Sequence, residues 1–275
     1  MSMHTEEAVR ARLNYLVEMA EKPTSYRYTP PPGVPQINWR SEPRLHTVYD
    51  GRRLVERFSL DEQGFVLLRE PTVVRDFFDD REVESVYYPE VEALAKRATG
   101  AEKVVIFDHT VRSKLRAKPG ANSIREPVLN VHNDYTVQSG PQRVRDLLEP
   151  PEAEMRLRHR FAEINVWRPI GGPVEESPLA ICDARSITPQ DLVAADLKYR
   201  DRNGEIYYAR FNPAHRWIYF PHMSSDEVLL LKCYDSQADG RARFTIHTAF
   251  DDPTSPANAH PRESIEVRMM LFFAA

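Results

Sequence analysis

The sequence is poor in glycine and cysteine, and it has no long apolar run. Only 10 of its 275 residues are glycine, and no GxSxG, GxGxxG, Walker A or HExxH string occurs. These absences count against serine hydrolases, nucleotide-binding proteins and zincins, because each of those sites depends on its own motif. The longest apolar stretches, such as Val228–Leu231 and Met269–Ala275, are far shorter than a membrane span.

The cysteine content and the charge restrict the cellular compartment and the classes of binding partner that we expect. The two cysteines, Cys182 and Cys233, do not form a CxxC pair, which disfavours a disulfide framework and a thiolate zinc site. The 37 basic and 41 acidic residues give a net charge of −4, so no global field favours nucleic acid or an anionic membrane. Residues 1–21 are charged and lack the apolar core of a signal peptide. We therefore expect a reducing, cytoplasmic location with neither nucleic acid nor membrane as a partner.

The first part of the chain has mainly helical patterns. Apolar residues between Glu6 and Lys22 recur at helical spacing, which predicts an amphipathic helix, and a second helical pattern covers Val73–Arg97. The proline-rich stretch Tyr28–Pro35 predicts an extended arm. Lys103–Asp108 is typical of a buried strand, and Arg112–Gly120 predicts a basic, flexible loop.

The second part of the chain is rich in short β-like runs, with one predicted helix around Gln142–Arg158. About eight strands in roughly 150 residues predict a β-sandwich or jelly roll rather than alternating β and α units. The runs are Val128–Val131, Phe161–Trp167, Leu179–Cys182, Ile206–Phe211, Trp217–Phe220, Val228–Tyr234, Ala242–Thr248 and Ile265–Phe273. We predict a mainly β fold with flanking helices, as one domain over residues 1–275. In it a helix-rich part (1–125) packs on a jelly-roll core (126–275), and the N-terminal helix and arm either cap the barrel or pack across a homodimer.

The sharpest local motif is the pair His132-x-Asp134. In a β-strand, residues two apart point to the same face, so this imidazole and this carboxylate would lie side by side. With a third histidine from a neighbouring strand they would form the two-histidine, one-carboxylate triad of non-haem iron oxygenases. The same pair on its own is also typical of a hydrogen-bonded strand end.

Three histidines compete for the third position. His247 lies in an alternating, strand-like run, and Arg262 follows it on the next such run. An arginine there offers a planar fork for the carboxylate of a keto acid bound to the metal through its other end. His222 and His215 have no arginine at that distance, so His247 is favoured, and each of the others could instead be a pocket histidine.

Other polar and aromatic residues are candidates for binding a co-substrate or substrate. Arg268 lies on the same strand face as Arg262 and is the alternative carboxylate clamp, unless it pairs with an acid such as Glu266. Arg168 either binds a substrate carboxylate or forms a structural ion pair with Asp183 or Glu205. An apolar substrate pocket could be lined by aromatic side chains, although such residues are more often plain core. These are Tyr135, Trp167, Tyr208, Trp217 and Tyr219.

Several longer motifs resemble one family, the hydroxylase/desaturase-like proteins of fungal and bacterial secondary-metabolite clusters, which includes the cephamycin methoxylation component. The resemblance covers roughly residues 60–275, including Gly64-Phe65 and His132-x-Asp134. The motifs on which the resemblance rests are Asn165-Val166-Trp167-Arg168-Pro169-Ile170, Pro178–Ala184, Pro213–Trp217, Asp226–Ser236, His247–Phe250 and Arg262–Arg268.

This resemblance implies a double-stranded β-helix and an Fe(II)/2-oxoglutarate-dependent dioxygenase that oxidises a small organic substrate by hydroxylation, desaturation or related C–H oxidation. By position, His132, Asp134 and His247 would hold iron, and Arg262 would grip the distal carboxylate of 2-oxoglutarate. Two other readings of the residues stay open. One is a cupin-like isomerase or lyase that uses zinc or manganese, and the other is a non-catalytic jelly roll that binds a small molecule.

Overall fold

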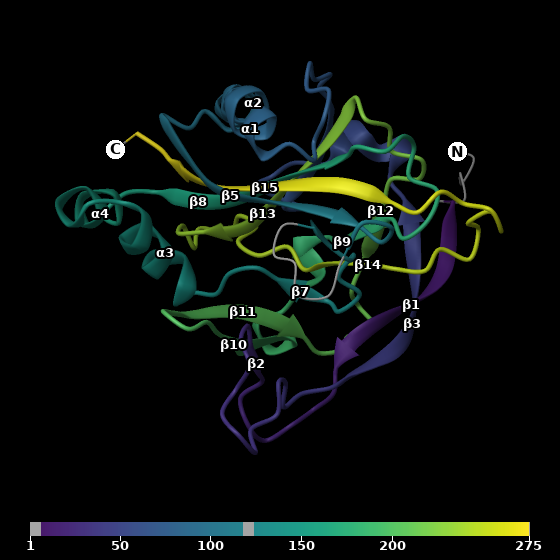
Figure 1. Cartoon of the computed structure of the whole chain (residues 1–275), viewed down its shortest axis with the longest axis horizontal. Helices are drawn as coiled ribbons and strands as arrows, with labels where there is room; N and C mark the ends of the chain where they lie inside the picture. The colour runs from purple at the N-terminus through teal and green to yellow at the C-terminus, as the bar shows by residue number, and fades with distance from the viewer. Residues whose placement is uncertain (1–6, 118–123, 275) are drawn as a thin grey trace.

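Two β-sheets packed face to face form the body of the molecule, as the computed structural model shows for residues 7–117 and 124–274 (Figure 1). The nine-stranded sheet has the order β1 (Ala8–Leu16), β3 (Ser41–Asp50), β12 (Trp217–Tyr219), β9 (Leu179–Cys182), β14 (His247–Ala249), β7 (His132–Asn133), β11 (Asn203–Ala209), β10 (Leu192–Lys198) and β2 (Thr24–Tyr26). The six-stranded sheet has the order β4 (Phe65–Arg69), β13 (Glu227–Asp235), β8 (Phe161–Pro169), β15 (Glu263–Phe272), β5 (Lys103–Ser113) and β6 (Ile124–Arg125).

The eight central strands are divided equally between the two sheets in a jelly-roll order. Along the chain, β5, β8, β13 and β15 enter the six-stranded sheet, whereas β7, β9, β12 and β14 enter the nine-stranded one. Antiparallel strands that switch between two packed sheets in this way build a double-stranded β-helix. The mainly β, jelly-roll prediction is therefore confirmed.

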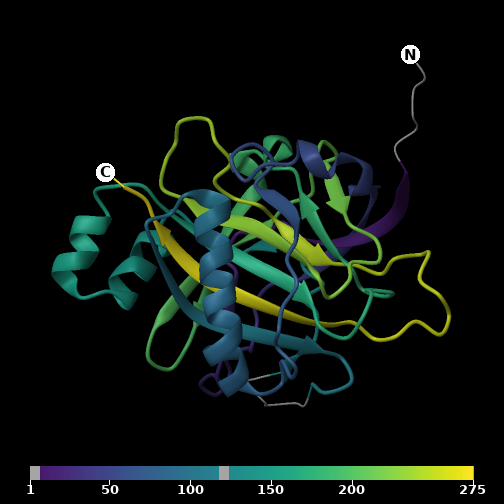
Figure 2. The ribbon, with the colours of Figure 1, turned by 90° about the horizontal axis from the view of Figure 1, so that it is seen from above.

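Two apolar clusters account for the packing of the six-stranded sheet. Trp167 and Leu229 lie between the sheets with Ile181 and Ile218 of the facing sheet. On the opposite face, Val166 packs against a helical segment. This segment consists of α1 (Asp80–Glu82), a π-helix (Val83–Tyr87) and α2 (Tyr88–Thr99), and Figure 2 shows α2 lying across the sheet. Alternate residues of β8 therefore face the inter-sheet space and the helices.

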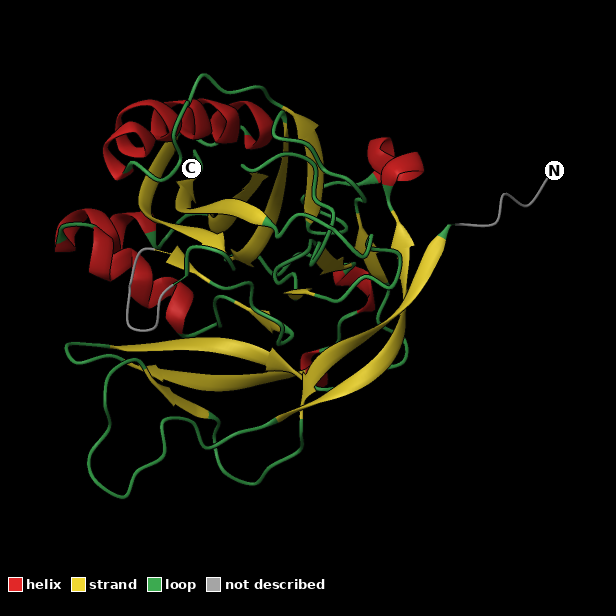
Figure 3. Ribbon diagram, turned by 45° about the vertical axis from the view of Figure 1, so that its right-hand side comes forward, coloured by secondary structure: helices red, strands yellow, loops and turns green. Residues whose placement is uncertain are grey.

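The remaining short helices lie around the sandwich. Two helices, α3 (Ser139–Leu147) and α4 (Pro150–Arg156), lie beside each other at one end of it (Figure 3). Three 3₁₀ turns cover Arg52–Arg57, Ala184–Ser186 and Pro189–Asp191. Within the described ranges, no helix combines the length and the apolar character needed to cross a bilayer.

The predicted helix at Glu6–Lys22 is wrong, because this segment is β1. It pairs antiparallel with β3 from Ala8↔Tyr49 to Leu16↔Ser41. Ala11, Leu13 and Tyr15 are buried at alternate positions, which is the period of a strand. The segment's apolar residues fit both periods, and pairing with a partner about 30 positions away decided between them. The part before residue 126 is accordingly not helix-rich, since it supplies β1 to β6.

Several predicted boundaries also differ. The helical pattern assigned to Val73–Arg97 is helical only from Asp80 to Thr99. The predicted helix at Gln142–Arg158 divides into α3 and α4, because proline cannot continue the first helix. β5 continues to Ser113, so Arg112 lies in a strand rather than in a loop, and Lys118–Gly120 fall outside the described residues. The predicted strand at Val128–Val131 is not a regular strand. Asn130 forms an isolated bridge with Asn14, and Val128 and Val131 accept backbone hydrogen bonds from Ala249 and Ala209.

Candidate metal centre

Three side chains predicted from the sequence meet between the two sheets. His132 on β7 is the register partner of His247 on β14, and their ring centroids are 4.5 Å apart. Asp134 follows β7 directly, and its Oδ1 lies 3.5 Å from Nε2 of His132. One ligand atom from each of the three residues lies within 4.8 Å of the other two. The arrangement is that of a two-histidine, one-carboxylate metal site.

Backbone contacts fix the tautomer of both histidines. Nδ1 of His132 lies 2.8 Å from the carbonyl oxygen of Asn130, and Nδ1 of His247 lies 3.0 Å from that of Thr245. A carbonyl oxygen only accepts, so each Nδ1 carries the hydrogen and each Nε2 keeps its lone pair. Burial, and then the neighbouring His247 ring, lower the pKa of His132 to about 4. His132 is therefore a neutral imidazole at neutral pH, as a metal ligand must be.

Asp134 is held by two donors on one of its oxygens. Its Oδ2 accepts a hydrogen bond from Nδ2 of Asn165 at 2.7 Å and one from Nε of Arg268 at 3.2 Å. Burial alone would raise the pKa of Asp134, but the Arg268 guanidinium and the two imidazoles hold it well below its ordinary value. The carboxylate is ionised, and Oδ1 is the oxygen turned to the histidines.

Arg268 is occupied by the site's carboxylates, so the structure does not support its alternative role as a co-substrate clamp. Besides Asp134, its guanidinium donates to Glu266 at 2.7 Å, to Asp108 at 3.0 Å and to Thr110 at 3.0 Å. The cause lies across the sheet, where Arg268 is the register partner of both Asn165 and Asp108. An arginine with three acidic partners has little capacity left for a further carboxylate.

Arg262 has the opposite character, because its guanidinium is buried and forms no ion pair with any residue that the structure describes. It is 4% exposed, and it donates from Nη1 to the carbonyl oxygen of Ser177 at 2.5 Å. Its Nε and the nearby Ser264 Oγ are buried and have no hydrogen-bond partner among the described residues. Burial, and then the charge of Arg112, lower the pKa of Arg262 to about 9. Unsatisfied donors two positions apart on one strand suit a dicarboxylate ligand such as 2-oxoglutarate.

Arg168 points away from this site, which corrects its prediction as a substrate residue. It is 1% exposed and lies on the face of β8 that packs against the helices. It donates to the Tyr87 hydroxyl at 2.9 Å and to the carbonyl oxygens of Glu70 and Ser225. The predicted ion pairs with Asp183 and Glu205 are absent as well, since these three acceptors take its donors.

The predicted aromatic residues divide between the site and other clusters. Trp167 lies beside Arg262, whose guanidinium carbon is 5.5 Å from the Trp167 ring centroid. Tyr135 follows Asp134, and burial, then Glu163 and Asp134, raise its pKa well above the ordinary value. Tyr208 packs instead against Trp39, with ring centroids 4.3 Å apart, and Tyr219 packs against Phe250 at 5.5 Å. Trp217 is buried in a further network, where its Nε1 donates to Tyr15.

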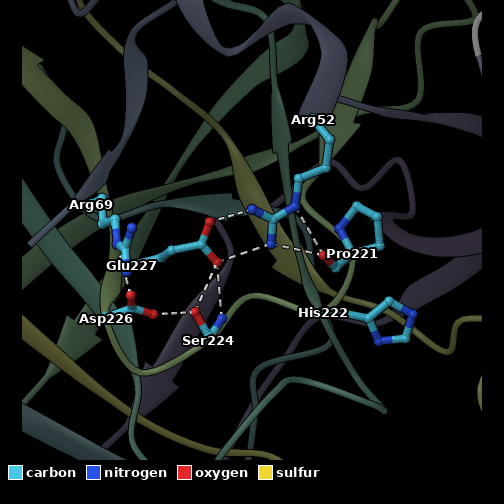
Figure 4. A pocket seen from close by; sticks show the side chains of 7 residues that line it. All are labelled: Arg52, Arg69, Pro221, His222, Ser224, Asp226 and Glu227. Carbon is cyan, nitrogen blue, oxygen red and sulfur yellow. Dashed lines mark hydrogen bonds and ion pairs between the residues drawn. The ribbon is translucent and has the colours of Figure 1, made fainter. Parts of the chain in front are cut away.

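The structure does not bring the two competing histidines to the centre. Nδ1 of His215 lies 3.0 Å from the Tyr15 hydroxyl and its Nε2 lies 3.2 Å from Asp191, so both ring nitrogens have partners. His222 lines a surface cavity of about 440 Å³ beside Arg52 and Glu227, as Figure 4 shows. Position in the fold therefore selects His247.

Sequence reasoning missed the residues that orient Asp134. Asn165 Nδ2 bridges Asp134 and Glu266, the latter at 3.1 Å. The only sequence signal was even spacing, since Asn165 and Trp167 share a face of β8 while Glu266 and Arg268 share one of β15. That signal places these residues on the same face of the sheet but does not predict which carboxylate they contact.

Comparisons with known proteins agree with this geometry. A family model described as an oxidoreductase/YMDC permease-like domain matches residues 13–272. The hydroxylase/desaturase efuI of Hormonema carpetanum is 34% identical and aligns with 96% of this chain and 95% of its own length. The Fe(II)/2-oxoglutarate-dependent dioxygenase nvfI of Aspergillus novofumigatus is 34% identical, with 90% of each chain covered. A solved structure of the iron and alpha-ketoglutarate-dependent endoperoxidase NvfI matches with a TM-score of 0.88 and 30% identity, over 98% of this chain and 99% of that one.

Proposed function

Because the chain belongs to the Fe(II)/2-oxoglutarate-dependent hydroxylase/desaturase family, we propose that His132, Asp134 and His247 bind its ferrous ion and that Arg262 binds the distal carboxylate of 2-oxoglutarate. Membership makes the protein an oxidoreductase of secondary metabolism that uses iron, 2-oxoglutarate, dioxygen and a small organic substrate. The observation that carries the residue assignment is the presence of both a three-ligand cluster and a buried Arg262 that has no ion pair among the described residues.

Each residue has a defined task in this proposal. The bound iron and co-substrate supply the oxidising power that attacks an unactivated C–H bond. The two imidazoles would coordinate the metal through Nε2, because backbone carbonyls accept hydrogen bonds from their Nδ1–H groups. Asp134 would coordinate it through Oδ1 alone, because Oδ2 accepts hydrogen bonds from Asn165 and Arg268. A site with three protein ligands leaves positions open for a chelating keto acid and for dioxygen.

Arg262 and its neighbours orient the co-substrate. The guanidinium and the Ser264 hydroxyl would each satisfy their unpaired hydrogen-bonding atoms on the distal carboxylate. Trp167 covers the guanidinium, and the buried surroundings exclude water, which strengthens the ion pair. Tyr135 and Trp167 stay as proposed substrate-side residues, since both lie next to these groups.

A redox-inactive isomerase or lyase and a non-catalytic binding protein are the alternatives to this reading. The relatives named as oxygenases disfavour both. The candidate outcomes are hydroxylation, desaturation or a related C–H oxidation. The single domain, the homodimer, the cytoplasmic location and the lack of a nucleic-acid partner stay predictions.

Metal and co-substrate binding test the residue assignment. The protein is loaded anaerobically with Fe(II), and iron content and 2-oxoglutarate affinity are measured by metal analysis and calorimetry. We expect one iron per chain and binding of 2-oxoglutarate that depends on the iron. Stoichiometric iron in an Asp134→Ala variant, or unchanged co-substrate affinity in an Arg262→Met variant, would contradict the proposal.

A further inference from the structure

Glu163 is a buried carboxyl group that has no role in the proposed binding of the metal or the co-substrate. It lies on β8 with 0% of its surface exposed, and neither Oε1 nor Oε2 has a hydrogen-bond partner among the described residues. Burying a carboxyl group without partners is costly, so such groups are rare outside functional sites. Its neighbours across the sheet are Tyr234 on β13 and Met270 on β15, which surround it with apolar surface.

The position of Glu163 relates it to the metal centre. Trp167, Asn165 and Glu163 share the face of β8 that looks between the sheets, at successive steps of about 7 Å. Trp167 contacts Arg262, and Asn165 contacts Asp134. Glu163 is the next side chain along this row, on the opposite side of the metal ligand from the co-substrate arginine. With the co-substrate on the Arg262 side, we infer that the organic substrate lies on the Glu163 side.

The surroundings favour a neutral carboxyl group. Burial raises the pKa of Glu163 well above its ordinary value, the Arg143 guanidinium opposes this, and the Asp134 carboxylate adds to it. A protonated carboxyl has one O–H donor and one strong acceptor on adjacent atoms. A hydroxyl group matches both at once, because it accepts from the O–H and donates to the carbonyl oxygen.

We propose that Glu163 is a specificity-determining contact of this enzyme and that it binds a hydroxyl group on an otherwise apolar substrate. The inference rests on the function proposed above, because it places the substrate beside the iron ligand Asp134. The ligand-free protein leaves the carboxyl unsatisfied, and the substrate hydroxyl replaces the missing partner. Glu163 therefore lowers the stability of the free protein and contributes to substrate affinity.

Two variants separate these effects. Glu163→Gln keeps the shape and the hydrogen-bonding capacity, whereas Glu163→Met keeps the length and removes all polar atoms. In thermal melts of the metal-free protein, we expect Glu163→Met to raise the midpoint by on the order of 4 °C and Glu163→Gln to change it little. Met270→Leu is the packing control, because it alters the cross-strand neighbour and leaves the carboxyl in place.

Binding is then measured with a panel of matched probes on protein loaded with Zn(II), which is redox-inert, and 2-oxoglutarate. Each pair consists of an aryl-methanol and the ethyl-arene in which a methyl group replaces the hydroxyl, and affinities come from ligand-observed NMR. We expect at least one alcohol to bind the wild type, Glu163→Gln and Met270→Leu about tenfold more tightly than its partner. Glu163→Met should bind both members of that pair equally.

Three results would overturn the inference. They are an absence of alcohol preference across the whole panel, a preference that survives in Glu163→Met, and a lower melting midpoint for Glu163→Met and for a second apolar variant, Glu163→Leu, which has a different shape. The last would mean that the carboxyl already has a partner in the free protein. Zinc and 2-oxoglutarate binding are measured first in the same samples, so their failure contradicts the proposed function and is seen separately from a failure of the Glu163 inference.

Discussion

Two buried clusters of this protein each set a histidine beside a carboxylate, and they differ in what the ring nitrogens have left to do. In the metal centre, Nε2 of His132 lies 3.5 Å from Asp134, and in the second cluster Nε2 of His215 lies 3.2 Å from Asp191. Nδ1 of His215 forms a hydrogen bond with the Tyr15 hydroxyl, which also accepts one from Nε1 of Trp217 at 2.8 Å. Nδ1 of His132 donates instead to the backbone carbonyl of Asn130.

The difference lies in the carboxylate as much as in the ring. Asp191 also accepts from the Thr188 backbone at 2.7 Å and from Asn212 at 3.1 Å, so a closed network of local bonds holds it. Asp134 has donors on Oδ2 only, and its second histidine neighbour, His247, adds another lone pair rather than a hydrogen. Lone pairs that converge without hydrogens between them make a metal site, whereas a saturated network makes a structural element.

The largest effect should come from removing a converging lone pair. His132→Ala and His247→Ala each leave two protein ligands, so we expect loss of stoichiometric iron and a fall in 2-oxoglutarate-dependent succinate formation of more than about 1,000-fold. His215→Phe should keep one iron per chain and lose stability instead. Metal analysis and thermal melts of all three variants test the comparison, which fails if His215→Phe loses the metal or His132→Ala retains it.

The next effect concerns the two arginines of the 262–268 segment, one unpaired and one fully paired. Arg262→Met removes the guanidinium of the pair that has no ion pair, so we expect 2-oxoglutarate to bind about 100-fold more weakly with iron content unchanged. Calorimetry with the metal-loaded variant measures this. Arg262→Lys keeps the charge without the fork and should recover only part of the affinity.

The local sequence pattern was enough to predict the core strands and two of the three candidate metal ligands, His132 and Asp134. The apolar runs behind β8, β13 and β15 are strand-like over their whole length, and His132-x-Asp134 needs only the two-residue period of a strand. The fold class and three clustered ligands followed from these features, together with the resemblance to a known family.

What could not be predicted depends on contacts between distant segments. The N-terminal strand β1 had an ambiguous apolar period that only its partner β3 resolves. Spacing from His247 favoured Arg262 but left Arg268, on the same strand face, as an alternative. Only the cross-strand neighbours Asn165 and Asp108 identify Arg268 as a partner of the metal carboxylate. Asn165 and Arg168 belong to one sequence motif but lie three positions apart, on opposite faces of β8, so the motif contributes to two separate sites.

A smaller effect should come from the donor that orients Asp134. Asn165→Ala removes the 2.7 Å hydrogen bond to Oδ2 and frees the carboxylate to turn. We expect a loss of about 10-fold to 100-fold in metal affinity with all three ligands intact. Thr110→Val is the matched control, because Thr110 contacts Arg268 but not Asp134. Competition titrations with Zn(II) measure both variants, and equal affinities would show that Arg268 alone positions the carboxylate.

The smallest effect should appear in the second cluster, as a dependence of stability on pH. Nε2 of His46 lies 3.2 Å from the Tyr15 hydroxyl, and burial, then the neighbouring His215 and the Arg10 guanidinium, lower the pKa of His46 to about 4. The unfolded chain takes up this proton near pH 6.5 and the folded one does not, so stability falls as the pH drops below 6.5. Between pH 6.5 and 5.5 the resulting loss of unfolding free energy is about 1 kcal/mol.

His46→Phe keeps a ring against Phe211 but cannot titrate, so its denaturant midpoint should fall less between pH 6.5 and 5.5 than that of the wild type. Since His132 titrates in both proteins, the difference between them isolates His46, and parallel curves would mean that the saturated network tolerates a charged imidazole.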